Sequence, residues 1–440
     1  MNASTDSAKA RFVSRFIPLT RQAVIADLCN MPDDDGERSA FVRLAHRLHK
    51  HRSQAYRKLA MELRQVYLPF SPDRDTVRAL ALSPEERQVA EERLASLTAH
   101  LLDRANYQRV SSQELDEILS AQSPYSLRIE VDLSEYDELQ VYTRETYVVE
   151  RTVRRPETGY ILKSRYDERV YRRLFVLLKL KPDDARAEEI ARSEKISLKK
   201  AMARVKRRRR GLPPDLSPDS VYVKVFKDLS QHDLQILFPL RTVQFRPFDK
   251  IKFYATAGGG TLFGAVSASG KLLAATNPIA AAGTLVAFVG LVGRQVAKFF
   301  NQRNLYMMEL SQKLFFHNLA NNRAAITLLL DRAEEEEVKE DLITLYYFQG
   351  ERFGDEELAA RKRKIEETLA ERYNIAVDFE LPDALARLER DGVATRENGT
   401  VTFTTLEEAS EIYARLIDAA DEEDEAHVCD RGSDGDVIEA

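Results

Sequence analysis

The residues best suited to specific chemistry lie in a basic segment from Arg192 to Arg210, which holds ten Lys or Arg residues and the single acid Glu194. Cations at this density bind phosphate. They do so on anionic lipid headgroups, at about 1 kcal/mol per residue near the surface, or along an RNA or DNA backbone. No aromatic residue interleaves the segment, so we expect no stacking on bases. A solvated charged helix that binds nothing remains an alternative. The candidate contact residues are Lys199, Lys200, Lys206, Arg207, Arg208, Arg209 and Arg210.

Acidic and histidine clusters are the other candidates, and we expect neither to bind a metal. The run Glu334–Glu337, with Glu340 and Asp341, would need an opposing carboxylate helix with Glu-x-x-His spacing, which the sequence lacks. The histidine cluster at 46–51 has basic neighbours and no carboxylate at ligand spacing. The sequence contains no nucleophile elbow, phosphate-binding loop or Ser–His–Asp order. We therefore expect no catalytic residues, cofactor or metal, and a protein that is not an enzyme.

Length and composition limit the number of folded units and the class of protein. The chain has 440 residues, more than one compact core of about 100–200 residues, which predicts two or three folded units. Its net charge is −5, and its mean hydropathy of −0.40 is typical of soluble proteins. The two cysteines, Cys29 and Cys429, exclude a disulfide scaffold and a Cys₄ metal site.

Changes of periodicity divide the chain into five parts. Residues 1–124 have the apolar spacing of helices and predict a helical domain. Residues 125–248 alternate like short strands and predict an α+β unit with 192–210 as a basic insertion. Residues 249–299 are the apolar region described below. Residues 300–417 predict helices followed by a two-stranded wing, the outline of a winged-helix module. Residues 418–440 hold ten acids and one Arg and predict a disordered tail.

The apolar region predicts a helical hairpin that crosses a membrane twice. It contains 18 uncharged residues at 253–270 and 22 more at 272–293. Eighteen helical residues span about 27 Å, close to the bilayer core of about 30 Å. Small residues at helical spacing would let the two helices pack closely. These residues are Gly260, Gly264, Ala268, Gly283, Ala287 and Gly290. A buried Gly/Ala-rich hairpin in a soluble core is the alternative.

The flanking charges predict an orientation for this hairpin. Basic residues precede it at 241–252 and follow it at 294–303, whereas only Lys271 lies in its turn. The positive-inside rule then places both termini in the cytoplasm. We therefore predict an α+β multidomain integral membrane protein of the cytoplasmic membrane, or of a mitochondrial membrane if the source is eukaryotic. The lipid bilayer is its expected partner.

The charge of the winged-helix-like module argues against DNA as its ligand. Residues 355–417 hold nine Lys or Arg and fifteen Asp or Glu, a net charge of −6. A phosphate-binding surface needs the opposite sign. We expect this module to contact protein or simply to pack, and we do not expect DNA.

Several segments together resemble the domain-of-unknown-function 3754 family, over about residues 16–417. The matching pieces include Phe16-Ile17-Pro18, Tyr67-Leu68-Pro69-Phe70, Val221–Leu229, Asp233-Leu234, Leu237-Phe238-Pro239, Leu314–Asn322 and Ala333–Glu340. That family includes an animal transmembrane protein of mitochondria. The resemblance implies an integral membrane protein of unknown molecular function, with no agreed catalytic residues.

The leading functional prediction is a membrane-anchored, cytoplasm-facing protein that binds or scaffolds partners. Its candidate partners are anionic lipid, an unidentified protein and further copies of the chain. One alternative is a pore or transporter formed by oligomerised hairpins. The other is a membrane-associated enzyme that acts on lipid or nucleic acid, which depends on the basic segment alone.

Overall fold

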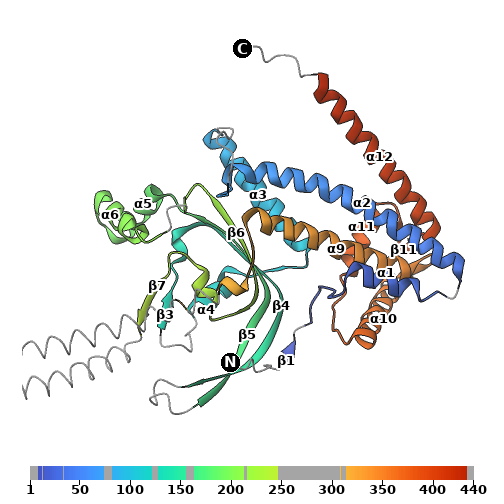
Figure 1. Cartoon of the computed structure of the whole chain (residues 1–440), viewed down its shortest axis with the longest axis horizontal. Coiled ribbons are helices and arrows are strands. Elements are labelled where there is room, and N and C mark those ends of the chain that lie inside the picture. The colour runs from blue at the N-terminus through green and yellow to red at the C-terminus, as the bar shows by residue number, and fades with distance from the viewer. Residues whose placement is uncertain are drawn as a thin grey trace, which may run out of the picture.

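Figure 1 shows the computed structural model of the chain, with a curved sheet at one end and packed helices at the other. The structure describes residues 8–11, 13–32, 34–73, 82–120, 127–154, 163–212, 216–245, 308 and 314–433.

A six-stranded antiparallel sheet is built around one long hairpin. β4 (Tyr136–Arg154) pairs with β5 (Lys163–Leu180), and β5 pairs with β6 (Val221–Ser230). β1 (Ala8–Arg11) and β2 (Gln108–Arg109) both pair with β4. β8 (Asn318–Asn321) pairs with β6 at the opposite edge, so the order is β1-β4-β5-β6-β8.

Both faces of this sheet are covered by a hydrophobic core. Successive residues of a strand point to opposite faces, so neighbouring residues of β5 belong to different cores. Phe175 and Leu177 belong to a core shared with α2 (Asp35–Tyr67), α3 (Pro84–Arg104) and α9 (Asn322–Phe348). Leu174 and Val176 belong to a second core on the other face, shared with α4 (Ser112–Ser120) and the short helix η4 (Leu234–Leu237).

The N-terminal helices begin where local capping signals specify. Asp34 caps α2 by accepting a hydrogen bond from the Glu37 amide. Ser83 and Glu86 form a reciprocal capping box at the start of α3, with Pro84 at its first position. α1 (Arg21–Cys29) precedes α2, and the short helix η1 (Leu68–Phe70) ends it.

α9 and α2 run side by side and connect the two ends of the molecule. The 27 residues of α9 span about 40 Å. The first half of α9, up to Ala333, packs in the sheet-side core, and the second half, from Val338, packs in a separate core at the other end. α2 divides in the same way, with Leu44 and Leu48 in the far core and Tyr56 and Leu63 in the sheet-side core.

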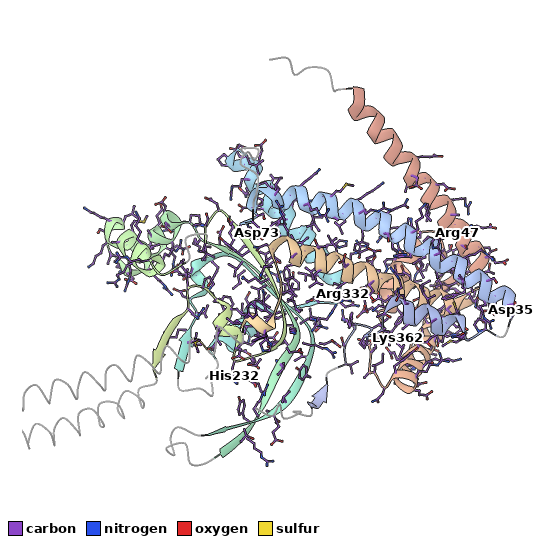
Figure 2. The ribbon with its side chains drawn as sticks, in the orientation of Figure 1. Asp35, Arg47, Asp73, His232, Arg332 and Lys362 are labelled. Carbon is purple, nitrogen blue, oxygen red and sulfur yellow. The ribbon has the colours of Figure 1, made fainter. Side chains whose placement is uncertain are left out.

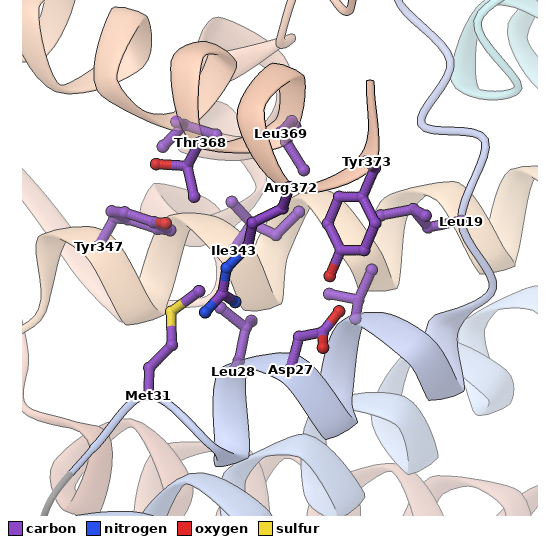
Figure 3. Close-up of a pocket in the computed structure, with 12 residues that line it drawn as sticks. Leu19, Asp27, Leu28, Met31, Ile343, Tyr347, Thr368, Leu369, Arg372 and Tyr373 are labelled. Atoms are coloured by element: carbon purple, nitrogen blue, oxygen red, sulfur yellow. The ribbon is translucent and has the colours of Figure 1, made fainter. Parts of the chain in front are cut away.

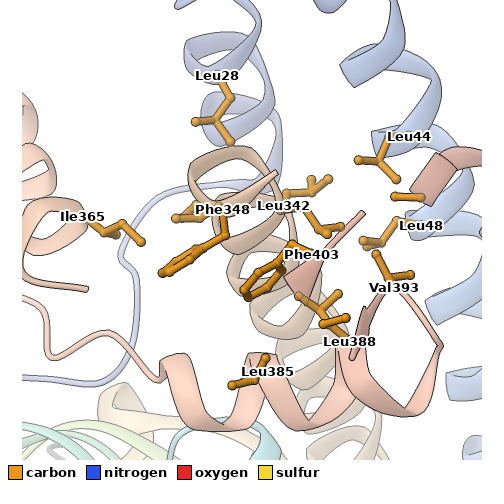
Figure 4. Close-up of a cluster of buried hydrophobic side chains, with 14 of the residues drawn as sticks. Leu28, Leu44, Leu48, Leu342, Phe348, Ile365, Leu385, Leu388, Val393 and Phe403 are labelled. Carbon is orange, nitrogen blue, oxygen red and sulfur yellow. The ribbon is translucent and has the colours of Figure 1, made fainter. Parts of the chain in front are cut away.

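The far core belongs to a unit with winged-helix element order. After α9 come β9 (Arg352–Gly354), α10 (Asp355–Tyr373), α11 (Leu381–Arg390), β10 (Ala394–Glu397) and β11 (Thr400–Phe403). β11 lies between β10 and β9, as the wing strands do in that fold. Figure 4 shows Phe348 of α9 against Phe403 of β11, with ring centroids 5.0 Å apart.

α12 (Leu406–Ser433) packs along α2 and then extends away from the body (Figure 1). Arg47 of α2, labelled in Figure 2, donates to the backbone oxygen and hydroxyl of Ser410 at 3.0 and 2.9 Å. The helix continues to Ser433, so the acidic segment from residue 418 to 433 is helical where the sequence predicted disorder.

Two smaller units project from the sheet. β3 (Leu127–Glu130) and β7 (Thr242–Phe245) form a two-stranded ribbon. α5 (Asp183–Glu194) and α6 (Leu198–Arg209) form a helical hairpin inserted between β5 and β6, which we call the α5–α6 arm.

The prediction of an integral membrane protein is corrected by the structure. In the described ranges, no helix combines the length and the apolar character needed to cross a bilayer. The long helices α2 and α9 both carry charged residues along their length. The α+β part of the fold prediction stands, whereas the transmembrane part and the cytoplasmic or mitochondrial membrane location do not. The hairpin predicted at 249–299, with its six small residues, lies outside the described residues, and the pore alternative depended on it.

Candidate functional site

The α5–α6 arm presents the predicted basic residues on a helix that has two different faces. Ala201 and Val205 of α6 pack against Ala187 and Ile190 of α5 in a small core of their own. At about 100° per residue, this contact defines an inner face of α6 and leaves the opposite face in solvent. The arm lies at the sheet end, away from the winged-helix unit (Figure 1).

Two of the predicted contact residues, Arg208 and Arg209, belong to the inner face and are internally neutralised. Arg209 is 3.2 Å from Glu135 and 2.5 Å from Asp183, and it also donates to the backbone oxygen of Lys181 at 2.8 Å. Arg208 is 3.0 Å from Asp132 and 3.2 Å from Glu135. Asp132 and the buried Glu135 lie directly before β4, so these ion pairs attach the arm to that end of the sheet.

The other five predicted residues lie on the outer side of α6, with Arg210 directly after its last residue. Lys199, Lys200, Lys206, Arg207 and Arg210 are all exposed, and they fall within an arc of about 120°. None of the five forms an ion pair with another described side chain, whereas their neighbour Arg204 pairs with Glu194. We call these five residues the α6 basic face.

The acidic run of α9 has the opposite character, since it is buried and opposed by cations. Glu336, Glu337, Glu340 and Asp341 are between 0 and 2% exposed. The side chains that face them are Arg52 of α2, Arg104 of α3, Arg387 of α11 and Lys339 of α9 itself. Among the described residues, no group of three or more His, Cys, Asp or Glu side chains is placed to hold a metal ion.

Asp341 lies at the centre of one part of this network. The Arg52 side chain is 2.8 Å from Asp341 and 2.6 Å from Asp391, which also accepts a hydrogen bond from the Tyr413 hydroxyl at 2.9 Å. Arg387 contacts Asp341 from the other side at 2.9 Å. Helices α2, α9 and α11 and the start of α12 are thus joined through two carboxylates.

Glu337 and Glu340 extend the network towards α3. Arg104 forms a bidentate pair with Glu337, one arm at 2.8 Å. Burial alone would raise the pKa of Glu337, but the Arg104 hydrogen bonds and the nearby arginine charges outweigh it and lower the pKa. Glu340 accepts from Asn106 at 2.9 Å and from Arg387 at 2.7 Å. Burial raises the pKa of Glu340 to about 8.

The same layer fastens the N-terminal segment that carries the Phe16-Ile17-Pro18 motif. Glu336 accepts a hydrogen bond from the Ile17 amide at 2.6 Å, and Lys339 donates to the backbone oxygens of Ile17 and Leu19 at 2.6 and 3.0 Å. Arg144 of β4 lies over the Phe16 ring at 3.8 Å. We call this set of buried charges around residues 336–341 the ionic layer.

The ionic layer was missed in the sequence because its cations come from distant helices. The interactions of the acidic run with Arg52, Arg104 and Arg387 span 289, 233 and 46 residues. One local signal was present: the four acids lie between apolar stretches of one helix, at 324–330 and 342–348. Charged residues that such apolar neighbours draw into a core must be paired there.

The chain has a recognisable family over its middle third. Residues 171–324 match the family model described as Protein of unknown function (DUF3754). The chain carries a DUF3754 domain. This domain begins in β5, contains α5, α6, β6 and β8, and ends at the start of α9. The family resemblance seen in the sequence is therefore confirmed for residues 171–324, whereas its extension to 16–417 and the likeness to the animal member stay predictions. No solved structure matches the chain.

Proposed function

We propose that the protein is a binding protein that holds the phosphate backbone of a nucleic acid on the α6 basic face, and we test it with RNA. The observation that carries this proposal is the set of five exposed cations on one arc of α6 that are free of ion pairs with other described residues. Three other arginines of α6, Arg204, Arg208 and Arg209, are each paired with a carboxylate. A cluster left unneutralised supplies the electrostatic term that dominates sequence-independent binding of nucleic acids.

The architecture of the arm favours a nucleic-acid backbone over a lipid surface. Helices that lie in a membrane interface insert an apolar face. The apolar face of α6 is already covered by α5 through Ala201 and Val205, and only Leu198, 52% exposed, remains at its edge. The α6 basic face can therefore contribute charge and little apolar area, which suits a polyanion in solution.

The winged-helix unit is not suited to binding nucleic acid. Its helix α11 corresponds to the one that enters the DNA groove in helix-turn-helix proteins. Arg387 of α11 points inward to Asp341 at 2.9 Å, and the unit carries a net charge of −6. A contact with protein suits this unit better.

The test is the affinity of the full chain for a fluorescent 20-nucleotide single-stranded RNA, measured by anisotropy. We expect a Kd of about 10⁻⁶–10⁻⁴ M near physiological salt. The double variant K206Q/R207Q should weaken binding about tenfold. The matched control is R363Q/K364Q, which removes two adjacent exposed cations from α10 and should leave the Kd unchanged. Equal losses in both variants, or tighter binding to phosphatidylserine vesicles than to RNA, would contradict the proposal.

A further inference from the structure

The α6 basic face consists of two rows of cations that run along the helix. At about 100° per residue, the members of each row lie within about 40° of one another, and the two rows are about 90° apart. The last residue of the first row, Arg210, continues the helical backbone with φ of −57° and ψ of −28°. The first row is Lys199, Lys206 and Arg210, and the second is Lys200 and Arg207. Two lines of positive charge therefore face solvent side by side.

α5 covers the side of α6 that faces away from these rows. Ala201 and Val205, which pack against α5, lie about 180° round the helix from the midpoint between the two rows. The residue at that midpoint is Ala203, which is exposed. When the basic face meets a ligand, α5 therefore stays behind α6, and a small side chain lies at the centre of the contact.

The arm lacks the side chains on which single-stranded bases stack. No Phe, Tyr, Trp or His occurs at residues 182–210. Proteins that bind single strands combine a basic groove with such aromatic side chains. The α6 basic face therefore has only the electrostatic term of the phosphate backbone. For each phosphate contact, that term is larger on B-form duplex DNA than on a single strand.

The dimensions of α6 match one groove of a B-form duplex. An α-helix with its side chains is about 10–12 Å across, and the major groove of B-DNA is about 12 Å wide. With α6 in this groove, the two rows point towards the two phosphate backbones that border it, and Ala203 faces the base edges. The major groove of an A-form RNA duplex is deep and narrow, so it does not admit the helix in the same way.

We propose that the α6 basic face binds double-stranded DNA without sequence specificity, with α6 in the major groove and one row of cations on each backbone. This inference rests on the proposed function and specifies the class of nucleic acid. The negative charge that argues against DNA belongs to the winged-helix unit at residues 355–417. The arm lies at the opposite end of the molecule from that unit (Figure 1).

The first test compares the affinity of the full chain for three fluorescent probes of one sequence, measured by anisotropy. The probes are a 20-base-pair DNA, a 20-base-pair RNA and a 20-nucleotide single-stranded RNA. Near physiological salt the DNA duplex should bind about fivefold tighter than the single strand, because the salt slope for each of five contacts differs by about 0.2. The RNA duplex should also bind more weakly than the DNA duplex.

Two double variants test whether both rows contact DNA. K199Q/K206Q removes two cations from the first row, and K200Q/R207Q removes both cations of the second. Each should reduce the magnitude of the slope of log K against log salt concentration on the DNA duplex by about 1.8. The matched control R363Q/K364Q, in exposed residues of α10, should leave that slope unchanged.

The second test locates α6 on the duplex. Guanine N7 lies in the major groove, so saturating protein should protect it from methylation by dimethyl sulfate. Ala203→Trp places a bulky ring between the two rows and should weaken binding of duplex DNA while binding of single-stranded RNA stays unchanged. Circular dichroism verifies that this variant folds, and the methylation result decides should it not fold.

The outcomes separate this inference from the proposed function. It is overturned if duplex RNA or single-stranded RNA binds as tightly as duplex DNA. It is also overturned if guanine N7 stays as reactive in the complex as in free DNA, or if only one row changes the salt slope. In each of these cases the binding of nucleic acid by the α6 basic face still stands. If none of the three probes binds, both proposals are wrong.

Figure 3 shows the other feature of the surface with a concave shape, an opening between α1, α9 and α10. It admits the centre of a water-sized sphere through only about 30 Å³. This space is too small for a drug-sized ligand, which needs about 300 Å³ or more. The basic arm therefore remains the surface on which we base the inference.

Discussion

Arg387 provides the sharpest test of the ionic layer. Its guanidinium is 2.7 Å from Glu340 and 2.9 Å from Asp341, and its side chain is 8% exposed. Replacing Arg387 with Gln removes the cation that these two carboxylates share and leaves them in a region that water cannot enter. Breaking a buried ion pair in this way costs about 3–5 kcal/mol. We expect the free energy of unfolding to fall by that amount.

The assay is urea unfolding followed by circular dichroism at 222 nm, and α11 supplies the matched control. Arg390 lies three residues further along the same helix, is exposed, and makes no ion pair with a described residue. Both residues lie in the last turn, so Arg390→Gln reproduces any loss of interaction with the helix dipole. It should cost less than about 1 kcal/mol. If the two variants lose the same stability, the ionic layer does not hold these helices together.

Three further predictions follow from named contacts. Burial raises the pKa of Glu340 to about 8, above its value of about 4.3 in an unfolded chain. The stability it contributes is therefore complete below pH about 4 and is lost as the pH rises to about 8. Urea unfolding of Glu340→Gln across this pH range should show a smaller decline in the free energy of unfolding. The same decline as in the wild type would contradict the prediction. Leu388 is 0% exposed in the winged-helix core, so Leu388→Ala should lower the free energy of unfolding by about 2–5 kcal/mol. A loss below about 1 kcal/mol would contradict the packing. Ser83→Ala breaks the capping box with Glu86 and should cost about 1 kcal/mol, with faster hydrogen exchange confined to the first turn of α3.

Some elements can be predicted from the sequence because their cause is local. The capping box at Ser83 starts α3, and the Asn398-Gly399 pair turns β10 into β11 with φ of 49° and 77°. The helix, helix and wing pattern led to the winged-helix outline. Each of these features depends on residues within a few positions of one another.

The division of the basic segment was also present in the sequence, although it was not used. On a helical projection, Arg208 and Arg209 fall on the side of Ala201 and Val205, away from Lys206 and Arg207. Their partner Glu135 lies in the short 3₁₀ helix before β4, some 70 residues earlier, which no local pattern reveals. Spacing can separate two faces of a helix, but the carboxylate that covers one of them comes from tertiary structure.

The ionic layer was missed and the membrane prediction was wrong for a common reason. Both were read as the properties of single segments. The acidic run of α9 was considered only as a possible metal site, whereas Arg52 and Arg387 approach it from helices 289 and 46 residues away. The membrane location was inferred from the apolar length of one region, and none of the described helices has the character of a span.

The salt dependence of RNA binding tests the α6 basic face most directly. For a single strand, the slope of log K against log salt concentration is about −0.7 for each phosphate that the protein neutralises. Full use of the five cations predicts a slope of about −3.5, and K206Q/R207Q should reduce its magnitude by about 1.4. R363Q/K364Q should leave the slope unchanged. A wild-type slope near zero, or one that K206Q/R207Q does not alter, would contradict the assignment of RNA binding to this face.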